Sequence, residues 1–274
     1  MAWIEIRNLS FNYGRRPVLQ NLSLAIQRGT LVALLGPNGC GKTTLLKLLL
    51  GLLPAQSGTV FFDHRPLPSL TRRERAARMA YVPQLHRPAF AYRVREVVLM
   101  GRMPHKRMLA PFSRRDHQLA EQALEKLGIG HLADRPYTEI SGGERQLALI
   151  ARALCQGAHT FILDEPTNGL DYGNQIRLLE QLAELAGNGY TFILSTHVPD
   201  HALWVAGQAV LMHQGTILAE GPPDQVVTRA NLGRLYDAQV SILELFENFR
   251  MCFPERMACR GREKGRMKGD KHRG

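Results

Sequence analysis

The apolar positions of the chain fall into short runs that glycine, proline and charged residues separate from one another. Residues 3–8 and 22–26 alternate apolar and polar side chains, which predicts two half-buried strands. Continuous apolar runs at 31–35, 160–163 and 191–196 are typical of strands buried on both faces. Further strands are predicted at 59–63 and 81–82, and a glycine turn predicts a hairpin from 209–212 and 216–219.

Apolar residues at helical spacing predict a second set of elements. The clearest pattern lies in 114–127, where leucines and alanines share one face. The segment 101–107 is basic and contains a proline, so we expect an exposed loop there, and residues 11–14 are expected to form a turn. Other helices are predicted at 45–50, 71–79, 94–100, 141–154 and 175–185, followed by two short helices that reach about residue 236.

A glycine-rich segment, Gly36-Pro37-Asn38-Gly39-Cys40-Gly41-Lys42-Thr43-Thr44, stands between the strand at 31–35 and the helix at 45–50. It fits the phosphate-binding pattern of Gly, four residues, Gly-Lys-Ser/Thr. Its glycines let backbone N–H groups and a helix N-terminus approach phosphate closely. In this pattern Lys42 reaches the β- and γ-phosphates and the hydroxyl of Thr43 binds Mg²⁺. A chance glycine turn is the alternative, and the flanking strand and helix favour a nucleotide triphosphate site.

Five other positions carry candidate chemistry. Ser141 precedes two glycines and has Glu144 three residues on, which is a capping box and also leaves amides open to an anion. Asp164 and Glu165 follow a buried strand, where the first suits Mg²⁺ and the second suits a general base. His197 also follows a buried strand, and Tyr13 precedes the phosphate loop. For these two, a structural role and contact with nucleotide remain open alternatives.

Composition limits the class of protein. The 274 residues, 45% hydrophobic and 22% charged, are ordinary for a globular protein, and no apolar run reaches membrane-span length, so we expect a cytosolic chain. Four cysteines are too few and too scattered for a disulfide framework or zinc site. From Arg250 onward nine basic and three acidic residues supply six of the eleven net positive charges. We expect a solvated, disordered tail at 250–274, with anionic lipid or nucleic acid as the alternative partners.

Taken in order, the phosphate loop, Gln84, Ile140-Ser141-Gly142-Gly143-Glu144, Phe161–Glu165, Asp171 and His197 resemble the ATP-binding subunit of an ABC transporter over residues 2–240. The resemblance implies an α/β fold, with a P-loop NTPase core of mostly parallel sheet flanked by helices. It also implies an N-terminal antiparallel β subdomain and an inserted α-helical signature subdomain. The expected domains are a core at 2–84 and 160–240, a helical subdomain at 85–159 and the tail.

The same resemblance implies a role for each candidate residue. Tyr13 would stack on adenine, Gln84 would contact Mg²⁺ and the attacking water, and Asp164 would hold Mg²⁺. Glu165 would be the catalytic base, His197 would hold the γ-phosphate, and the signature serine and glycines would close over ATP bound to a second copy. Asp171 would shape the contact between the two copies. The candidate ATP-binding residues are Tyr13, Gly36, Pro37, Asn38, Gly39, Cys40, Gly41, Lys42, Thr43, Thr44, Ser141, Gly142, Gly143, Asp164 and Asp171; the catalytic ones are Glu165, His197 and Gln84; and the Mg²⁺ ligands are Thr43, Gln84 and Asp164.

A finer resemblance is carried by Val94-Arg95-Glu96-Val97-Val98, Gly101-Arg102 and Pro104-His105. These are similar to ATPase subunits of importers for iron–siderophore, haem and cobalamin, which implies two membrane permease subunits and, indirectly, a substrate-binding protein. The chain would then lie peripherally at the cytoplasmic face of the inner membrane. It departs from that pattern at Arg93, Leu147 and Asn174, and mildly at Ile140 and Glu144.

Several rival functions share the nucleotide motifs. The segment Asp171–Gln175 is also similar to importers of molybdate or tungstate. An exporter ATPase subunit has every nucleotide motif, and only the stretch 94–105 argues against it. A soluble ABC-type ATPase acting on DNA or ribosomes is supported only by the basic tail, and no nucleic acid partner is expected. The sequence therefore predicts an ATPase subunit that powers the import of a metal chelate.

Overall fold

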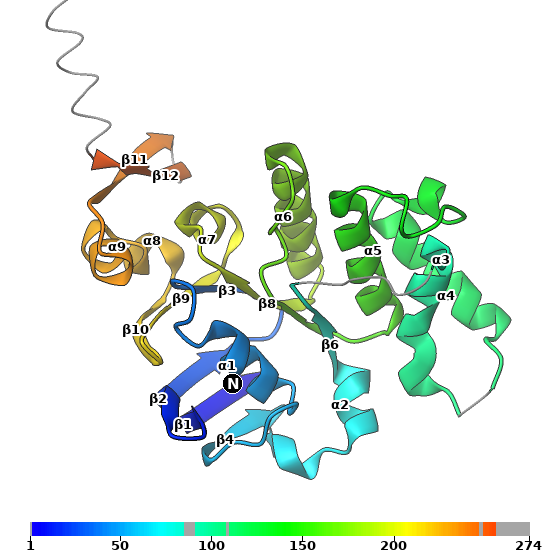
Figure 1. The fold of residues 1–274 in the computed structure, drawn as a ribbon, viewed down its shortest axis with the longest axis horizontal. Helices are drawn as coiled ribbons and strands as arrows, with labels where there is room; N and C mark the ends of the chain where they lie inside the picture. Colours follow the sequence, from blue (N-terminus) through cyan, green and yellow to red (C-terminus); the bar gives the residue numbers. More distant parts are fainter. Residues whose placement is uncertain (1, 85–90, 108–109, 247–248, 256–274) are drawn as a thin grey trace, which may run out of the picture.

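A six-stranded sheet forms the centre of the computed structural model, which describes residues 2–84, 91–107, 110–246 and 249–255 (Figure 1). The strand order is β10-β9-β3-β8-β7-β6, in which β10 pairs antiparallel at the edge and the other five strands are parallel. The strands are β3 (Leu31–Leu35), β6 (Met79–Val82), β7 (Thr160–Leu163), β8 (Thr191–Thr196), β9 (Gln208–His213) and β10 (Thr216–Gly221). The predicted α/β class is confirmed.

Both faces of this sheet are covered by apolar side chains. Along β3, Leu31, Ala33 and Leu35 belong to one buried cluster, whereas Val32 and Leu34 belong to the other. Successive side chains of a strand point to opposite faces, so a strand between two apolar layers must be apolar at every position. The continuous runs in the sequence therefore predicted these strands correctly.

A second, antiparallel sheet with the order β2-β1-β4-β5 forms the N-terminal layer. Its strands are β1 (Ile4–Tyr13), β2 (Arg16–Ile26), β4 (Ser57–Phe62) and β5 (Arg65–Pro66). The predicted turn at residues 11–14 is wrong, because β1 continues through Tyr13, which pairs with Arg16 on β2. Only Gly14 and Arg15 lie between the strands, and Gly14 adopts a left-handed φ of 59° that suits a tight turn.

The helices that lie between β6 and β7 gather at one end of the molecule (Figure 1). They are α3 (Val94–Leu99), the 3₁₀ helix η2 (Met100–His105), α4 (Arg114–Lys126), η3 (Gly130–Leu132) and α5 (Gly142–Cys155). The other helices are α1 (Lys42–Leu49), η1 (Leu67–Ser69), α2 (Arg72–Arg78), α6 (Tyr172–Gly187), α7 (Pro199–Val205), α8 (Pro223–Val226) and α9 (Arg229–Tyr236). In the described ranges, none has the length and apolar content needed to cross a membrane.

The segment 101–107 is not the loop that its composition predicts, although Met103, His105 and Arg107 are exposed as expected. Residues up to His105 form η2, and the Arg102 side chain is only 14% exposed. Arg102 donates from Nε to Oδ1 of Asp116 at 3.0 Å and from Nη1 to the carbonyl of Cys155 at 3.0 Å. This basic side chain does not face solvent, because it joins the start of α4 to the end of α5.

Helix α6 begins three residues earlier than predicted. Asp171 accepts a hydrogen bond from the backbone N–H of Asn174 at 2.8 Å and so caps the helix at Tyr172. An aspartate followed by a glycine two positions on is a weak sequence signal for a helix start, which explains why the apolar pattern alone placed the start at Gln175.

A C-terminal hairpin of β11 (Val240–Phe246) and β12 (Phe249–Pro254) lies at the opposite end from α3–α5 (Figure 1). The predicted disordered tail is therefore wrong for residues 250–254, which pair with β11 from Glu244 to Val240. Residues 256–274 of that tail, including Cys259, lie outside the described residues. Cys40, Cys155 and Cys252 are free thiols.

Candidate active site

The glycine-rich loop connects β3 directly to α1, as predicted. Gly39 and Gly41 have φ values of 81° and 111°, which side-chain-bearing residues rarely adopt. Gly36 has no room for a Cβ, which would lie 2.4 Å from the carbonyl oxygen of Met212. The Lys42 amino group folds back over the loop and donates to the carbonyls of Gly36 at 2.7 Å and Pro37 at 3.0 Å. The loop thus forms a closed cradle with a buried cation at its centre.

Cys40 fills space inside this cradle. Its thiol is buried, and burial raises its pKa, so it remains uncharged. A Cβ placed on Gly36 would lie 2.8 Å from its sulfur atom. Cys40 therefore packs as a small apolar residue inside the loop.

Asp164 follows β7 and lies beside the first turn of α1. The Thr43 hydroxyl is 3.2 Å from Asp164 Oδ1, and the fully buried Ser195 hydroxyl donates to the same oxygen at 2.7 Å. Burial, followed by the nearby Asp164 carboxylate, raises the pKa of Tyr81 to about 12. A hydroxyl and a carboxylate are oxygen ligands of the kind that Mg²⁺ prefers, so the donor set of Thr43 and Asp164 fits that ion.

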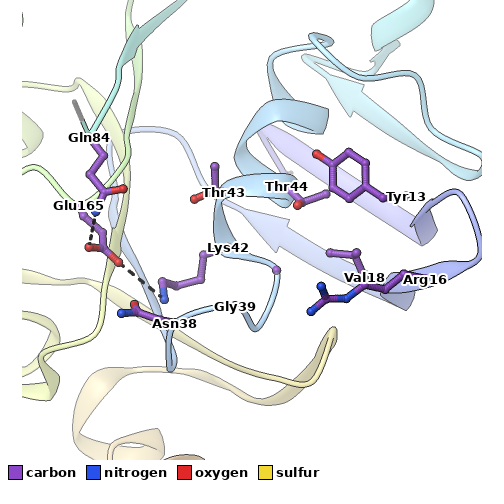
Figure 2. A pocket seen from close by; sticks show the side chains of 11 residues that line it. Tyr13, Arg16, Val18, Asn38, Gly39, Lys42, Thr43, Thr44, Gln84 and Glu165 are labelled. Carbon is purple, nitrogen blue, oxygen red and sulfur yellow. Dashed lines mark hydrogen bonds and ion pairs between the residues drawn. The ribbon is translucent and has the colours of Figure 1, made fainter. Parts of the chain in front are cut away.

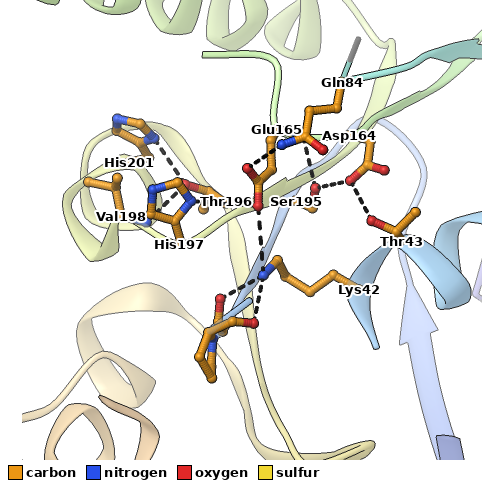
Figure 3. Close-up of polar contacts among 12 residues, drawn as sticks. Lys42, Thr43, Gln84, Asp164, Glu165, Ser195, Thr196, His197, Val198 and His201 are labelled. Carbon is orange, nitrogen blue, oxygen red and sulfur yellow. Dashed lines mark hydrogen bonds and ion pairs between the residues drawn. The ribbon is translucent and has the colours of Figure 1, made fainter. Parts of the chain in front are cut away.

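Glu165 lies at the centre of a group of polar side chains (Figure 3). Its carboxylate accepts a hydrogen bond from Gln84 Nε2 at 3.0 Å, lies 3.9 Å from Lys42 Nζ and lies 3.6 Å from His197 Nδ1. Its backbone has a φ of 47°, an unfavourable conformation for a side-chain-bearing residue, and its N–H donates to Ser195 Oγ at 2.9 Å. These contacts fix the position of a carboxylate at the strand end, where a carboxylate can act as a general base.

Lys42, Gln84 and Glu165 line one side of a cavity of about 480 Å³ (Figure 2). Tyr13 lies across the cavity from Gln84 and Glu165, and it is 49% exposed. Its ring packs against that of Phe11 in a T-shaped arrangement, with 4.9 Å between the ring centroids. An exposed ring beside a phosphate loop offers a stacking surface for a base. Arg16 and Val18 on β2 also line the cavity, although no motif in the sequence indicates either residue.

Ser141, Gly142 and Gly143 lie outside this cavity. Ser141 caps α5 by accepting from the Glu144 N–H at 3.3 Å, while its own N–H donates to the Glu144 carboxylate at 2.7 Å. The hydrogen bond from the Ser141 N–H, and after it the Ser141 hydroxyl, lower the pKa of the Glu144 carboxyl. A separate cavity of about 400 Å³ is lined by Ser141, Gly143, Asn174 and Arg177 among others. Asp171 also lies apart from the phosphate loop, at the start of α6.

The structure therefore brings together Tyr13, the loop 36–44, Gln84, Asp164, Glu165 and His197, and it keeps the signature residues and Asp171 elsewhere. Ser195 is the functional residue that the sequence missed, because it reads as an ordinary position of a buried strand. Among the described residues, no cluster of histidine, cysteine, aspartate and glutamate forms a further metal site.

Comparison with protein families matches residues 19–168, more than half of the chain, to the family described as ABC transporter. The chain belongs to the ABC transporter family. Its sheet order, phosphate loop and inserted helices are those of the ATP-binding unit, and ATP-binding subunits of this family hydrolyse ATP. The chain is accordingly an ABC ATPase.

Relatives of this ABC ATPase include subunits of importers. The ferric enterobactin transport protein FepC of Escherichia coli is 35% identical over 245 residues, which cover 89% of this chain and 90% of FepC. The hemin import protein HmuV of Rhodococcus jostii is 37% identical over 231 residues, which cover 84% of this chain and 78% of HmuV. A solved inward-facing ABC transporter described as of metal-chelate type has a TM-score of 0.83 and 33% identity, and the match covers 93% of this chain and 98% of that one.

Proposed function

We propose that this ABC ATPase powers the import of a metal chelate of the iron–siderophore, haem or cobalamin type. The relatives whose names specify a cargo of this class, and the solved transporter of metal-chelate type, support that substrate class. The proposed ATP hydrolysis rests on the position of Glu165, which contacts Gln84, Lys42 and His197 at the edge of the phosphate loop.

In the proposed site, ATP lies along the cavity from Tyr13 to Glu165. The Tyr13 ring would stack on adenine, and the backbone of loop 36–41 with Lys42 would hold the phosphates. Mg²⁺, held by Thr43, Asp164 and Gln84, would neutralise charge on the β- and γ-phosphates.

Hydrolysis would then depend on two side chains at the strand ends. Glu165 would accept a proton from the attacking water, and Gln84, whose Nε2 lies 3.0 Å from the Glu165 carboxylate, would orient that water. His197, which is 48% exposed and faces Glu165, would contact the γ-phosphate. Because Gln84 and Lys42 hold the carboxylate in place, little movement is needed to bring it to the attacking water.

We propose that the active unit is a head-to-tail homodimer, in which Ser141, Gly142 and Gly143 of one copy close over the ATP of the other. The N-terminal amides of α5 are suited to bind phosphate, yet these residues line a cavity separate from that of their own loop. This separation is expected if the signature residues serve a second copy. Asp171, at the start of the neighbouring helix, would shape the contact between copies.

The permease subunits would dock in a groove between α2, η2 and the end of α1. A cavity of about 490 Å³ there is lined by Leu50, Leu52, Arg75, Pro104 and Gln156 among others. Leu52 is 61% exposed and nearby Met103 is 60% exposed, so apolar surface is available for a partner helix. The chain would thereby lie peripherally at the cytoplasmic face of the membrane.

The substitution Glu165→Gln tests the catalytic assignment. We expect it to leave ATP affinity unchanged and to abolish turnover, because the amide cannot accept the proton. Glu180→Gln, the same change at an exposed position of α6, is the matched control and should hydrolyse ATP normally. Near-normal ATPase activity in Glu165→Gln would show that another group is the base.

The same variant tests the dimer. Without hydrolysis, ATP should convert Glu165→Gln from monomer to dimer, which size-exclusion chromatography with light scattering would measure. Adding Ser141→Arg should leave ATP binding intact and prevent the dimer. The larger side chain would occupy the space in which the partner's phosphates would lie. If the double variant still dimerised with ATP, the signature residues would not form the second half of the site.

Cargo is tested with the assembled transporter. The chain should co-purify with a membrane permease, and its ATPase rate in proteoliposomes should rise when a chelate-loaded binding protein is added. Iron–siderophore, haem and cobalamin would be compared with molybdate. Stimulation by molybdate alone would point to the runner-up importer class, and transport without any binding protein would point to an exporter.

A further inference from the structure

The loop that carries His197 is held by two contacts from the C-terminal part of the chain. The Tyr236 hydroxyl donates to the His197 carbonyl oxygen at 2.9 Å. Three residues after His197, the Asp200 carboxylate accepts a hydrogen bond from the Cys252 N–H at 2.7 Å. One contact comes from the end of α9 and the other from β12, which packs against α7. The backbone is therefore held at the His197 carbonyl itself and again at Asp200, in the first turn of the helix that follows.

Tyr236 is well suited to fix a neighbouring backbone. It is the last residue of α9, a helix anchored in the core by Leu232 and Leu235, which are buried. Burial raises the pKa of the Tyr236 phenol, so the hydroxyl keeps its proton and can donate. The attachment point is thus part of the rigid core, and the hydrogen bond is present throughout the neutral pH range.

His197 has little packing of its own to define its position. Its side chain is 48% exposed, and its ring Nδ1 lies 3.6 Å from the Glu165 carboxylate. A cavity of about 260 Å³ lies beside it, lined by Asp200, Tyr236 and Cys252 among others. The loop consequently has room to move if the hydroxyl is removed, and a small displacement of a catalytic group can cost a large factor in rate.

We propose that Tyr236 is a positioning residue for His197, and that the β11–β12 hairpin is the second support of the same loop. The hydroxyl fixes the backbone of His197 so that its ring faces Glu165 and the γ-phosphate end of the cavity. This inference rests on the proposed contact between His197 and the γ-phosphate. It gives the C-terminal segment, which follows the expected end of the ATPase domain at residue 240, a function in hydrolysis.

The test is Tyr236→Phe in the full-length chain, which removes the hydroxyl and keeps the ring. Tyr190→Phe, at the opposite end of β8, is the matched control. We expect kcat to fall about three- to tenfold, as the loss of one hydrogen bond in the transition state implies. The Kd for ATP and the melting temperature should equal those of the control, whereas a merely structural residue would lower kcat only together with stability.

A double-mutant cycle identifies the residue through which Tyr236 acts. In a His197→Ala background, Tyr236→Phe should cause no further loss in the single-turnover rate, which remains measurable at low activity. Asp200→Ala removes the hydrogen bond to Cys252 and leaves Tyr236 intact, and it should also lower kcat. This variant tests the support of the His197 loop if Tyr236→Phe does not fold.

Three results would overturn the inference: an unchanged kcat in Tyr236→Phe, an equal loss in both backgrounds, or a loss matched by lower stability. If His197→Ala itself hydrolysed ATP at the normal rate, the proposed role of His197 would fail instead. The two failures are therefore distinguishable.

Discussion

Ser195→Ala should affect both stability and catalysis, because one buried hydroxyl holds both carboxylate residues of the site. Ser195 Oγ donates to Asp164 Oδ1 at 2.7 Å and accepts from the Glu165 N–H at 2.9 Å. The substitution removes a hydrogen bond to a charged group, worth about 1.5–3 kcal/mol, and leaves a buried N–H without its acceptor, which costs about 1–3 kcal/mol. The two effects share one atom and are not additive, so we expect a loss of about 3 kcal/mol.

The free energy of unfolding would be measured by urea denaturation of the nucleotide-free chain, with the melting temperature as a second measurement. A loss of about 3 kcal/mol corresponds to a decrease of about 6–12 °C for a domain of this size. The ATPase rate should fall by about ten- to one-hundredfold, because Asp164 and the strained backbone of Glu165 lose a shared restraint.

Ser69→Ala is the matched control for this prediction. Its hydroxyl also makes a hydrogen bond of 2.7 Å, to the Pro66 carbonyl, but it is exposed, so its removal should change stability by less than about 0.5 kcal/mol. Equal effects of Ser195→Ala and Ser69→Ala would refute the reasoning, because burial and the shared contact would then add nothing.

Two further predictions concern other buried groups. Arg102→Met should destabilise the chain by about 2 kcal/mol in urea denaturation, since it leaves the Asp116 carboxylate without the donor at 3.0 Å. The control Arg107→Met, at an exposed position, should have no effect. Equal losses in the two variants would refute a structural role for the ion pair. Burial, aided by the nearby His197, lowers the pKa of His201 from 6.5 to about 4. Between these pH values His201 is protonated in the unfolded chain and neutral in the folded one. Stability therefore decreases as pH falls from 6.5 to 4. His201→Gln should remove up to about 3 kcal/mol of this pH dependence, and an unchanged slope would contradict the assignment.

Local patterns were sufficient to predict the elements that place the phosphate loop. The run at 31–35 is β3 residue for residue, because both faces of the central sheet are apolar and no other periodicity competes. The loop motif specifies its own geometry through glycines at positive φ. By contrast, the roles of Gln84 and His197 came from the family resemblance, since a glutamine or histidine at a strand end has no distinctive local pattern.

Ser195 could not be identified in this way because its function depends on register. β7 and β8 are parallel neighbours in which Leu163 pairs with Leu194, so the residues that follow each of these leucines come together. Asp164 therefore meets Ser195, although 31 positions separate them in the sequence. Apolar patterning predicts that both strands are buried, but it does not specify which strand lies beside which or with what offset.

The C-terminal hairpin was missed for a different reason, which is that composition averages over a segment. The basic tail taken as a whole has few apolar residues, but its first five residues belong to β12 and are held by specific partners. Arg250 lies 3.6 Å from Glu244 on β11, and the Cys252 N–H meets Asp200 beside the active-site loop. Net charge cannot indicate such pairing, because it depends on acidic residues that lie before the tail in the sequence. A charge-rich segment next to a folded domain can therefore be ordered wherever the domain supplies the counter-charges and acceptors, and in this chain it is ordered at the point where it contacts the loop of His197.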